Sequence, residues 1–428
     1  MDALRELALW QQQEYTAMKP GLGRIGTFLK AVGSPETAFP SIVVAGTNGK
    51  GSTARMIAAM LTGGGYKTGL YISPHLVSIT ERISVNGQEI SLKTLAKLFT
   101  RYRLVARRCQ LTYFECITGL CLVYFAQQQV DCAVLEVGLG GRFDAVNAVN
   151  RRMANVITEI GFDHTAVLGN TITAIAREKA GIITANVPVI SGVHRAAAKK
   201  VLRDTARKCH TRLYEIGRDF SVNSAIHSVA DRQHLSYKDS VGKIDLIVPL
   251  LGEYQTHNAA VAVQTVRLSK EYGFSVSNTQ IQKSIRHVTW PGRFEVIKRS
   301  IGDKKQTVLL DGAHNPAAME AFVKAFKKTR WGKQKRVVLF GVLKDKDYRT
   351  VIKQVAIVAK KVVFVPFDSP RRLSVETLTR EWQRYLPKKQ IVQGTSIEQV
   401  LTLIKNEPIV VAAGSLYMIG ALKRGLKP

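Results

Sequence analysis

The chain has 428 residues, of which 46% are hydrophobic and 22% charged, with no low-complexity tract. This composition is typical of a soluble globular protein, and the length favours two domains over one. No run of about 18 uncharged apolar residues occurs, which excludes a membrane-spanning helix. The mixed charge of residues 1–6 is unlike a signal peptide, and the five cysteines form no CxxC pair, so we expect a cytoplasmic protein with free thiols.

The net charge is unusual, because 62 Lys and Arg residues face 32 Asp and Glu residues and give a formal value of +30. Three interpretations are open: a solvated basic surface, steering of an acidic substrate, or nucleic-acid binding. The basic residues are widely spread, with one denser stretch at residues 324–336. No aromatic stacking motif typical of RNA-binding sheets is visible.

Short apolar, β-branched runs recur along the chain, and most lead into a helical pattern. They lie at residues 42–44, 133–135, 155–157, 187–190, 307–310, 337–340, 362–365 and 409–412. Runs this uniformly apolar are typical of strands buried on both faces of a parallel sheet. Crossover helices are expected at Ser52–Thr62 and Pro316–Lys328. The alternation predicts an α/β fold.

Two segments depart from this alternation of strands and helices. Residues 213–251 alternate polar and apolar side chains and contain turn signals, which predicts a small antiparallel insertion. The sequence Trp290-Pro291-Gly292-Arg293 is typical of a hinge, and a fresh strand–helix series follows it. We therefore predict two domains, residues 1–296 and 297–428.

The segment 46–52, with the sequence GTNGKGS, joins the strand at 42–44 to a predicted helix. A strand, a glycine turn and a helix N-terminus together bind phosphate, because backbone N–H groups and the helix dipole favour an anion. Glycine lets the backbone approach the phosphates closely. Lys50 supplies a positive charge to the β- and γ-phosphates, and Ser52 could hold a phosphate or Mg²⁺. We predict a nucleotide site here.

This loop departs from the common G-x-x-x-x-G-K-[ST] pattern in two places. Val44 stands where the first glycine is usual, and Gly51 separates Lys50 from the hydroxyl of Ser52. The departure distinguishes the loop from that of ordinary P-loop proteins.

Polar side chains follow other predicted strands, where open α/β sheets usually bind their ligands. They are Ser73, Glu136, Asp163 and His164, with Lys179 at the end of a predicted helix. Hard oxygen ligands suit Mg²⁺. Glu136 with Ser73 or Ser52 predicts one Mg²⁺ site, and neutral His164 could complete a second.

In the second half, the run at 307–310 enters the polar turn 311–316, and residues 414–417 repeat this strand-end pattern. Arg293 lies in the predicted hinge, where closure of the domains could bring its guanidinium onto an ATP phosphate.

Taken together, these motifs resemble the folylpolyglutamate synthase/dihydrofolate synthase family of the Mur ligases. The matching segments are GTNGKGS at 46–52, YISPH at 71–75, EVGLGGRFD at 136–144, DH at 163–164, KAGII at 179–183 and DGAHNP at 311–316. They occur in the family's order across nearly the whole chain. The resemblance implies an N-terminal P-loop-type ATPase domain with a mostly parallel sheet. It also implies a smaller, Rossmann-like C-terminal α/β domain, with the active site between the two.

The resemblance also implies roles for single residues. Mg²⁺ would bind Ser73 and Glu136, a second ion would bind His164, and Lys179 would be carboxylated by CO₂, which requires a neutral amine. ATP would contact Gly49, Lys50, Gly51, Ser52, Asn258, Arg293 and Asp311. Folate would face Thr112, Tyr113, Phe114, Glu115, Phe143, Asp144 and Ala145. Catalytic roles would fall to Lys50, Lys179, His314 and Ser415, the last two linked to the incoming glutamate.

One departure concerns the folate segment. The family commonly reads Asp-Ala-Thr-Asn after the Gly-Gly turn, whereas this chain has Val146 in place of the threonine. The missing hydroxyl puts a contact near the folate in doubt.

The resemblance implies an ATP-dependent amide ligase that forms an acyl phosphate on a folate carboxylate and then joins L-glutamate to it. Two activities fit: folylpolyglutamate synthase, which extends reduced folates at the γ-carboxylate, and dihydrofolate synthase acting on dihydropteroate, alone or as a second activity. A P-loop nucleic-acid-binding protein is a remote alternative, without a Walker B strand end or helicase motifs. We expect a monomer that binds folate, glutamate and ATP, but neither nucleic acid nor membranes.

Overall fold

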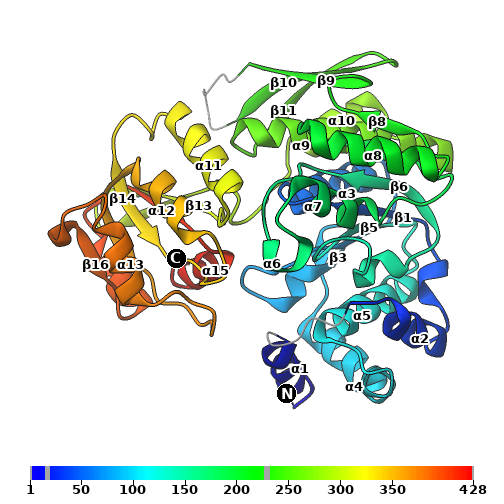
Figure 1. The fold of residues 1–428 in the computed structure, drawn as a ribbon, viewed down its shortest axis with the longest axis horizontal. Coiled ribbons are helices and arrows are strands. Elements are labelled where there is room, and N and C mark those ends of the chain that lie inside the picture. Colours follow the sequence, from blue (N-terminus) through cyan, green and yellow to red (C-terminus); the bar gives the residue numbers. More distant parts are fainter. Residues whose placement is uncertain (1, 15–19, 226–231, 427–428) are drawn as a thin grey trace.

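The computed structural model describes residues 2–14, 20–225 and 232–426 and shows two α/β bodies side by side (Figure 1). The larger sheet contains β1 (Ser41–Ala45), β2 (Thr68–Tyr71), β3 (Ile83–Val85), β4 (Gln88–Glu89), β5 (Cys132–Glu136), β6 (Arg152–Ile157), β7 (Val189–Ser191) and β8 (Leu213–Glu215). Their order is β4-β3-β2-β5-β1-β6-β7-β8, and every neighbouring pair from β2 to β8 is parallel. The predicted mostly parallel sheet is confirmed.

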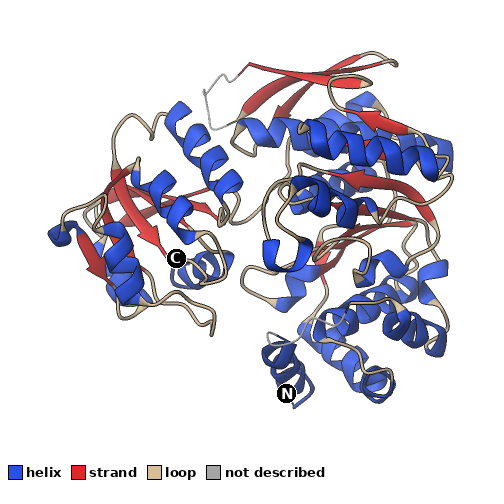
Figure 2. Cartoon of the chain, viewed as in Figure 1, coloured by secondary structure: helices blue, strands red, loops and turns tan. Residues whose placement is uncertain are grey.

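Helices cover both faces of this sheet (Figure 2). They are α1 (Asp2–Glu14), α2 (Gly23–Ala31), α3 (Lys50–Gly63), α4 (Leu92–Arg108), α5 (Tyr113–Gln127), α6 (Thr165–Leu168), α7 (Ile172–Ala180), α8 (Ala196–Lys208), α9 (Glu253–Leu268) and α10 (Asn278–Ile285). Short 3₁₀ turns occur at η1 (Pro35–Thr37), η2 (Ile79–Arg82), η3 (Ala145–Ala148) and η4 (Ser269–Tyr272).

Successive residues of the central strands enter different cores, which explains their uniformly apolar sequence. Val43 and Leu135 pack with residues of α4 and α5, whereas Ile42 and Val134 pack with residues of α3 and α9. Because a strand points alternate side chains to opposite faces, a sheet covered on both sides needs apolar residues at every position.

A three-stranded antiparallel sheet, in the order β11-β10-β9, lies beside α9 and α10. Its strands are β9 (Phe220–Ala225), β10 (Gln233–Asp239) and β11 (Lys243–Val248). The expected insertion therefore begins later than residue 213, because Leu213–Glu215 pairs in parallel with β7 and extends the larger sheet.

The C-terminal domain is a mixed sheet in the order β12-β13-β17-β14-β15-β16. Its strands are β12 (Glu295–Ile301), β13 (Lys304–Asp311), β14 (Arg336–Phe340), β15 (Ala359–Phe364), β16 (Ile391–Gln393) and β17 (Ile409–Ala413). Its helices are α11 (Pro316–Lys328), α12 (Tyr348–Ala356), α13 (Val375–Trp382), α14 (Ile397–Leu403) and α15 (Leu416–Gly425), with η5 (Lys388–Gln390). Only β12 runs antiparallel to its neighbour.

The predicted fold class is thus confirmed, although the predicted boundary at residue 297 falls inside β12. No helix within the described ranges is long and apolar enough to cross a membrane.

Candidate active site

The phosphate loop connects β1 to α3, and its glycines are required by the space around them. Gly46 and Gly49 have φ values of 146° and 89°, and a Cβ on them would collide with Thr158 and Asn258 respectively. The Thr47 N–H donates to the Glu159 carbonyl at 2.8 Å, which fixes the loop to the chain just after β6. Only glycine combines these positive φ angles with so close an approach.

Glu136, the last residue of β5, faces this loop. Its carboxylate is buried, and Oε2 accepts a hydrogen bond from the Ser73 N–H at 2.9 Å. A Cβ on Gly51 would lie 3.2 Å from the same oxygen. Burial raises the pKa of Glu136, whereas the nearby Lys50, the Ser73 N–H and Arg293 lower it. A cation bound beside this carboxylate would stabilise its charged form.

Lys179 is 4% exposed, at the end of α7, and its Nζ donates to the Gly46 carbonyl at 2.7 Å. Burial, together with the charge of Lys50, lowers the pKa of Lys179 to about 7. A large part of this amine is therefore neutral near neutral pH, which a nucleophilic or CO₂-accepting lysine needs.

His164 follows β6, and its ring faces the C-terminal domain. Its Nε2 lies 3.5 Å from Lys346 Nζ. Partial burial and the charge of Lys346 lower the pKa of His164 to about 4, so the ring is neutral at neutral pH, as a metal ligand must be. No group of three or more His, Cys, Asp and Glu side chains in the described ranges could hold a metal by itself.

The C-terminal domain contributes Asp311, at the end of β13. Its two oxygens accept hydrogen bonds from the Ala313 and Phe294 N–H groups, both at 2.8 Å. Gly312 packs so closely against Arg293 that a Cβ would collide with the guanidinium. The hinge arginine and the strand-end aspartate are thus held in one place.

A cavity of about 300 Å³ brings these groups together from both domains. Of the predicted site residues, it is lined by Gly49, Lys50, Gly51, Ser52, Ser73, Glu136, His164, Lys179, Asn258, Arg293, Asp311 and His314. Ser415 lies just outside this lining, next to Leu416, and its buried Oγ has no hydrogen-bond partner in the part of the chain described.

The predicted folate residues do not line the cavity. Thr112 is the N-cap of α5, Glu115 completes its capping box, and the Glu115 carboxylate also accepts two hydrogen bonds from Arg24. Asp144 is the N-cap of η3, and burial raises its pKa to about 6. Phe143 is 47% exposed. A role for these segments in folate binding stays a prediction.

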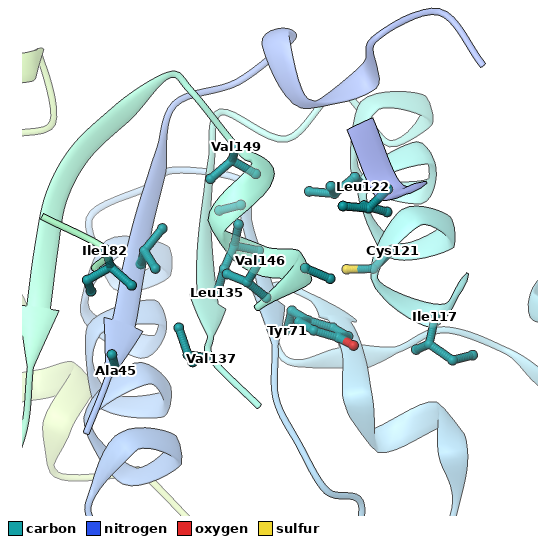
Figure 3. Packing of buried hydrophobic residues seen from close by; sticks show 14 of the residues in the cluster. Ala45, Tyr71, Ile117, Cys121, Leu122, Leu135, Val137, Val146, Val149 and Ile182 are labelled. Carbon is teal, nitrogen blue, oxygen red and sulfur yellow. The ribbon is translucent and has the colours of Figure 1, made fainter. Parts of the chain in front are cut away.

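Val146 lies in the core of the N-terminal domain. It is fully buried and belongs to the same apolar cluster as Tyr71, Cys121 and Leu135, as Figure 3 shows. A side chain at this position faces the core, so the missing threonine hydroxyl costs no contact inside the cavity.

Sequence reasoning missed several groups near the site. His194 and His257 line the cavity with ring centroids 4.8 Å apart, and Asn315 and Lys346 reach Asp163. His257 and Asn315 lie beside or within segments already singled out. His194 follows β7 and Lys346 follows β14, so the strand-end rule could have found both.

Comparison with known proteins agrees with this geometry. The family model described as Mur ligase middle domain matches residues 44–266, and Mur ligase, glutamate ligase domain, matches residues 292–416. The chain is 33% identical over 423 residues to dihydrofolate synthase/folylpolyglutamate synthase of Bacillus subtilis, covering 96% of each protein. The chain belongs to the folylpolyglutamate synthase/dihydrofolate synthase family of the Mur ligases.

Further members of this family agree in sequence and in structure. Folylpolyglutamate synthase of Lacticaseibacillus casei is 34% identical over 422 residues, which cover 94% of each protein. The structure of Mycobacterium tuberculosis folylpolyglutamate synthase complexed with ADP matches with a TM-score of 0.89 at 30% identity, over 100% of this chain and 99% of that one.

Proposed function

We propose that this chain is an ATP-dependent ligase that joins L-glutamate to a folate through an acyl phosphate. The observation that carries the proposal is the cavity between the two domains, which unites a phosphate loop, a buried carboxylate and a C-terminal histidine. The family models and relatives support the same reaction, and ATP is the co-substrate.

The phosphate loop and the hinge would position ATP. Backbone N–H groups at the start of α3 and the Lys50 ammonium hold the β- and γ-phosphates, and Arg293 adds a second positive charge from the hinge. The folate carboxylate attacks the γ-phosphate, ADP leaves, and the glutamate amine then displaces phosphate from the activated carbonyl. Most of the catalysis comes from positioning two anions and an amine in line.

The cavity fits Mg²⁺. Glu136 presents a buried carboxylate beside the phosphate loop, and Ser73 and Ser52 line the same space, so these oxygens would hold an ion together with ATP phosphate and water. Bound there, Mg²⁺ would neutralise charge on the phosphates. His164 would hold a second ion, and its neutral ring agrees with that role.

We further propose that Lys179 is carboxylated. Its burial and its lowered pKa of about 7 provide the neutral amine that CO₂ requires, and the product would be an anion beside the metal residues. His314 and Ser415 would receive the incoming glutamate, and the segments 112–115 and 143–145 would face the folate.

Two activities remain within the proposal, and the Bacillus subtilis relative carries both names. We favour extension of reduced folates, with dihydrofolate synthesis as the second candidate.

We also propose that the domains divide at the hinge 290–294 rather than at residue 297, because β12 begins at Glu295. We propose in addition that the enzyme acts as a monomer.

One assay separates these readings: release of ADP from ATP and L-glutamate, with tetrahydrofolate, dihydropteroate or DNA added in turn. We expect release with one or both pterin substrates and none above background with DNA. Absence of release with either pterin substrate, under conditions where the protein binds ATP, would contradict the proposed function.

A further inference from the structure

Asp163 is one of the points at which side chains of the C-terminal domain contact the N-terminal domain. Three C-terminal side chains reach its carboxylate: Lys346 Nζ lies 2.6 Å from Oδ1, Asn315 Nδ2 donates to Oδ2 at 2.9 Å, and His314 Nε2 lies 3.6 Å from Oδ2. A single carboxylate thus joins residues from the start of α11 to one from the loop after β14.

This contact is shielded from water. The side chains of Asp163 and Lys346 are 9% and 7% exposed. In a buried place, an ionic group that loses its partner is far more costly than at the surface.

The contact between the domains also includes the phosphate loop. Asn315 is 2% exposed, and its Nδ2 also donates to Asn48 Oδ1 at 3.1 Å. Its Oδ1 accepts from the Ala318 N–H at 2.9 Å and so caps α11. Anything that shifts the C-terminal domain away from Asp163 would pull Asn315 and the neighbouring His314 from the loop that holds ATP.

We propose that Lys346 is a positioning residue that fastens the C-terminal domain onto Asp163 and thereby places His314 and Asn315 against the phosphate loop. The expected effect of Lys346 on turnover rests on the proposed function, but the contact between the domains can be measured whether or not that function is correct. Lys346 acts through Asp163 on residues that line the cavity.

A second pair between the domains provides the matched control. Lys328 Nζ, on α11, lies 3.0 Å from Glu253 Oε2 on α9, and the two side chains are 44% and 40% exposed. Exposed ion pairs of this kind contribute little, because water and salt screen them. Lys328 therefore joins the same two domains with the same chemistry but away from the cavity.

Loss of Lys346 should also have an effect on cation binding that loss of a purely structural lysine would not have. Its ammonium lies 3.5 Å from His164 Nε2, so it repels any cation bound to that nitrogen. Loss of the ammonium should impair turnover while leaving divalent-cation affinity unchanged or higher.

The experiment compares Lys346→Met, Lys346→Arg, Asp163→Asn, the double variant Lys346→Met/Asp163→Asn and Lys328→Met in the full-length chain. Thermal unfolding first shows which variants fold. We expect Lys346→Met to lower kcat about 100-fold, the scale on which misplaced reacting groups slow an enzyme, with a smaller change in the KM for ATP. Lys346→Arg should recover part of that loss, and the double variant should be no worse than either single one.

Two further measurements keep the test independent of activity. Small-angle scattering should show a larger radius of gyration for Lys346→Met than for wild type and Lys328→Met, and Mn²⁺ binding in the presence of a non-hydrolysable ATP analogue should be at least as tight as in wild type. The proposal is wrong if Lys346→Met retains kcat within threefold of Lys328→Met, or if the losses of kcat in Lys346→Met and Asp163→Asn add in the double variant. It is also wrong if the radius of gyration of Lys346→Met is unchanged, or if its Mn²⁺ binding weakens. Lack of folate-dependent ADP release in wild type would overturn the proposed function instead, and the scattering comparison would still decide whether Lys346 fastens the domains.

Discussion

At the scale of single residues, the site depends on charges held in buried positions. Lys50 begins helix α3 and Glu136 ends strand β5, and both line the cavity at the phosphate loop. Glu136 is buried and Lys50 is partly buried, so each charge acts more strongly on the phosphates or on a bound cation than it would at the surface.

We expect Lys50→Ala and Glu136→Ala each to lower glutamate-dependent ADP release by about 100-fold or more, because each removes a charge that acts on the transferring phosphate. Steady-state turnover of the purified variants checks this. Lys30→Ala, at an exposed position on α2, is the control and should match wild type. Near-normal turnover in either site variant would remove that residue from the site.

Lys179 gives a prediction about pH. Its folded-state pKa of about 7 lies below the usual 10.5, so the neutral amine that reacts with CO₂ dominates above pH 7 and the ammonium dominates below it. We expect ¹³C-bicarbonate to give a carbamate signal in NMR spectra that declines as the pH falls through about 7. Lys179→Arg should lack the signal, and a signal that persists in this variant would assign the carbamate elsewhere.

At the scale of elements, the strand β1, the glycine turn and the helix α3 could be predicted from the sequence, because their apolar and glycine patterns are local. The residues that surround the turn could not be predicted in this way. The reason that Gly49 must be glycine is Asn258 on α9, more than 200 residues away, whose side chain fills the space that a Cβ would need.

Substitution of that glycine therefore has two costs that can be separated. Gly49→Ala combines a positive φ with a collision, whereas Gly65→Ala has a φ of 98° and open space around it. We expect both variants to lose roughly 1–2 kcal/mol of stability from backbone strain, and only Gly49→Ala to raise the KM for ATP. Urea unfolding and ATP titration measure the two effects, and equal KM values would contradict the role of Asn258.

The 3₁₀ turn η3 gives a second prediction at this scale. Val146→Thr restores the residue that the family commonly has, but its hydroxyl would enter an apolar core. We expect a loss of about 1–3 kcal/mol in the free energy of unfolding, because a buried hydroxyl without a partner is costly. The KM for folate should not change, and a clear fall in that KM would show that the side chain reaches the substrate.

At the scale of the whole molecule, the proposed reaction makes it possible to test the role of the net charge of +30, because folate, glutamate and ATP are all anionic. If the charge steers substrates, raising the ionic strength from about 0.02 M to 0.3 M should raise their KM values, because the screening length falls to several ångströms. A KM for folate that does not depend on salt would favour the solvated-surface interpretation.

The sequence by itself determined the α/β class, the phosphate loop and the polar residues at strand ends, because each depends on residues close together in the chain. The parallel sheet then brings Ser73, Glu136 and His164 to one edge without further information. The tertiary structure alone decided that Val146 belongs to the core and that Thr112 and Glu115 do not line the cavity. It alone brought Lys346 to Asp163, 183 residues away, because that contact depends on how the two domains pack.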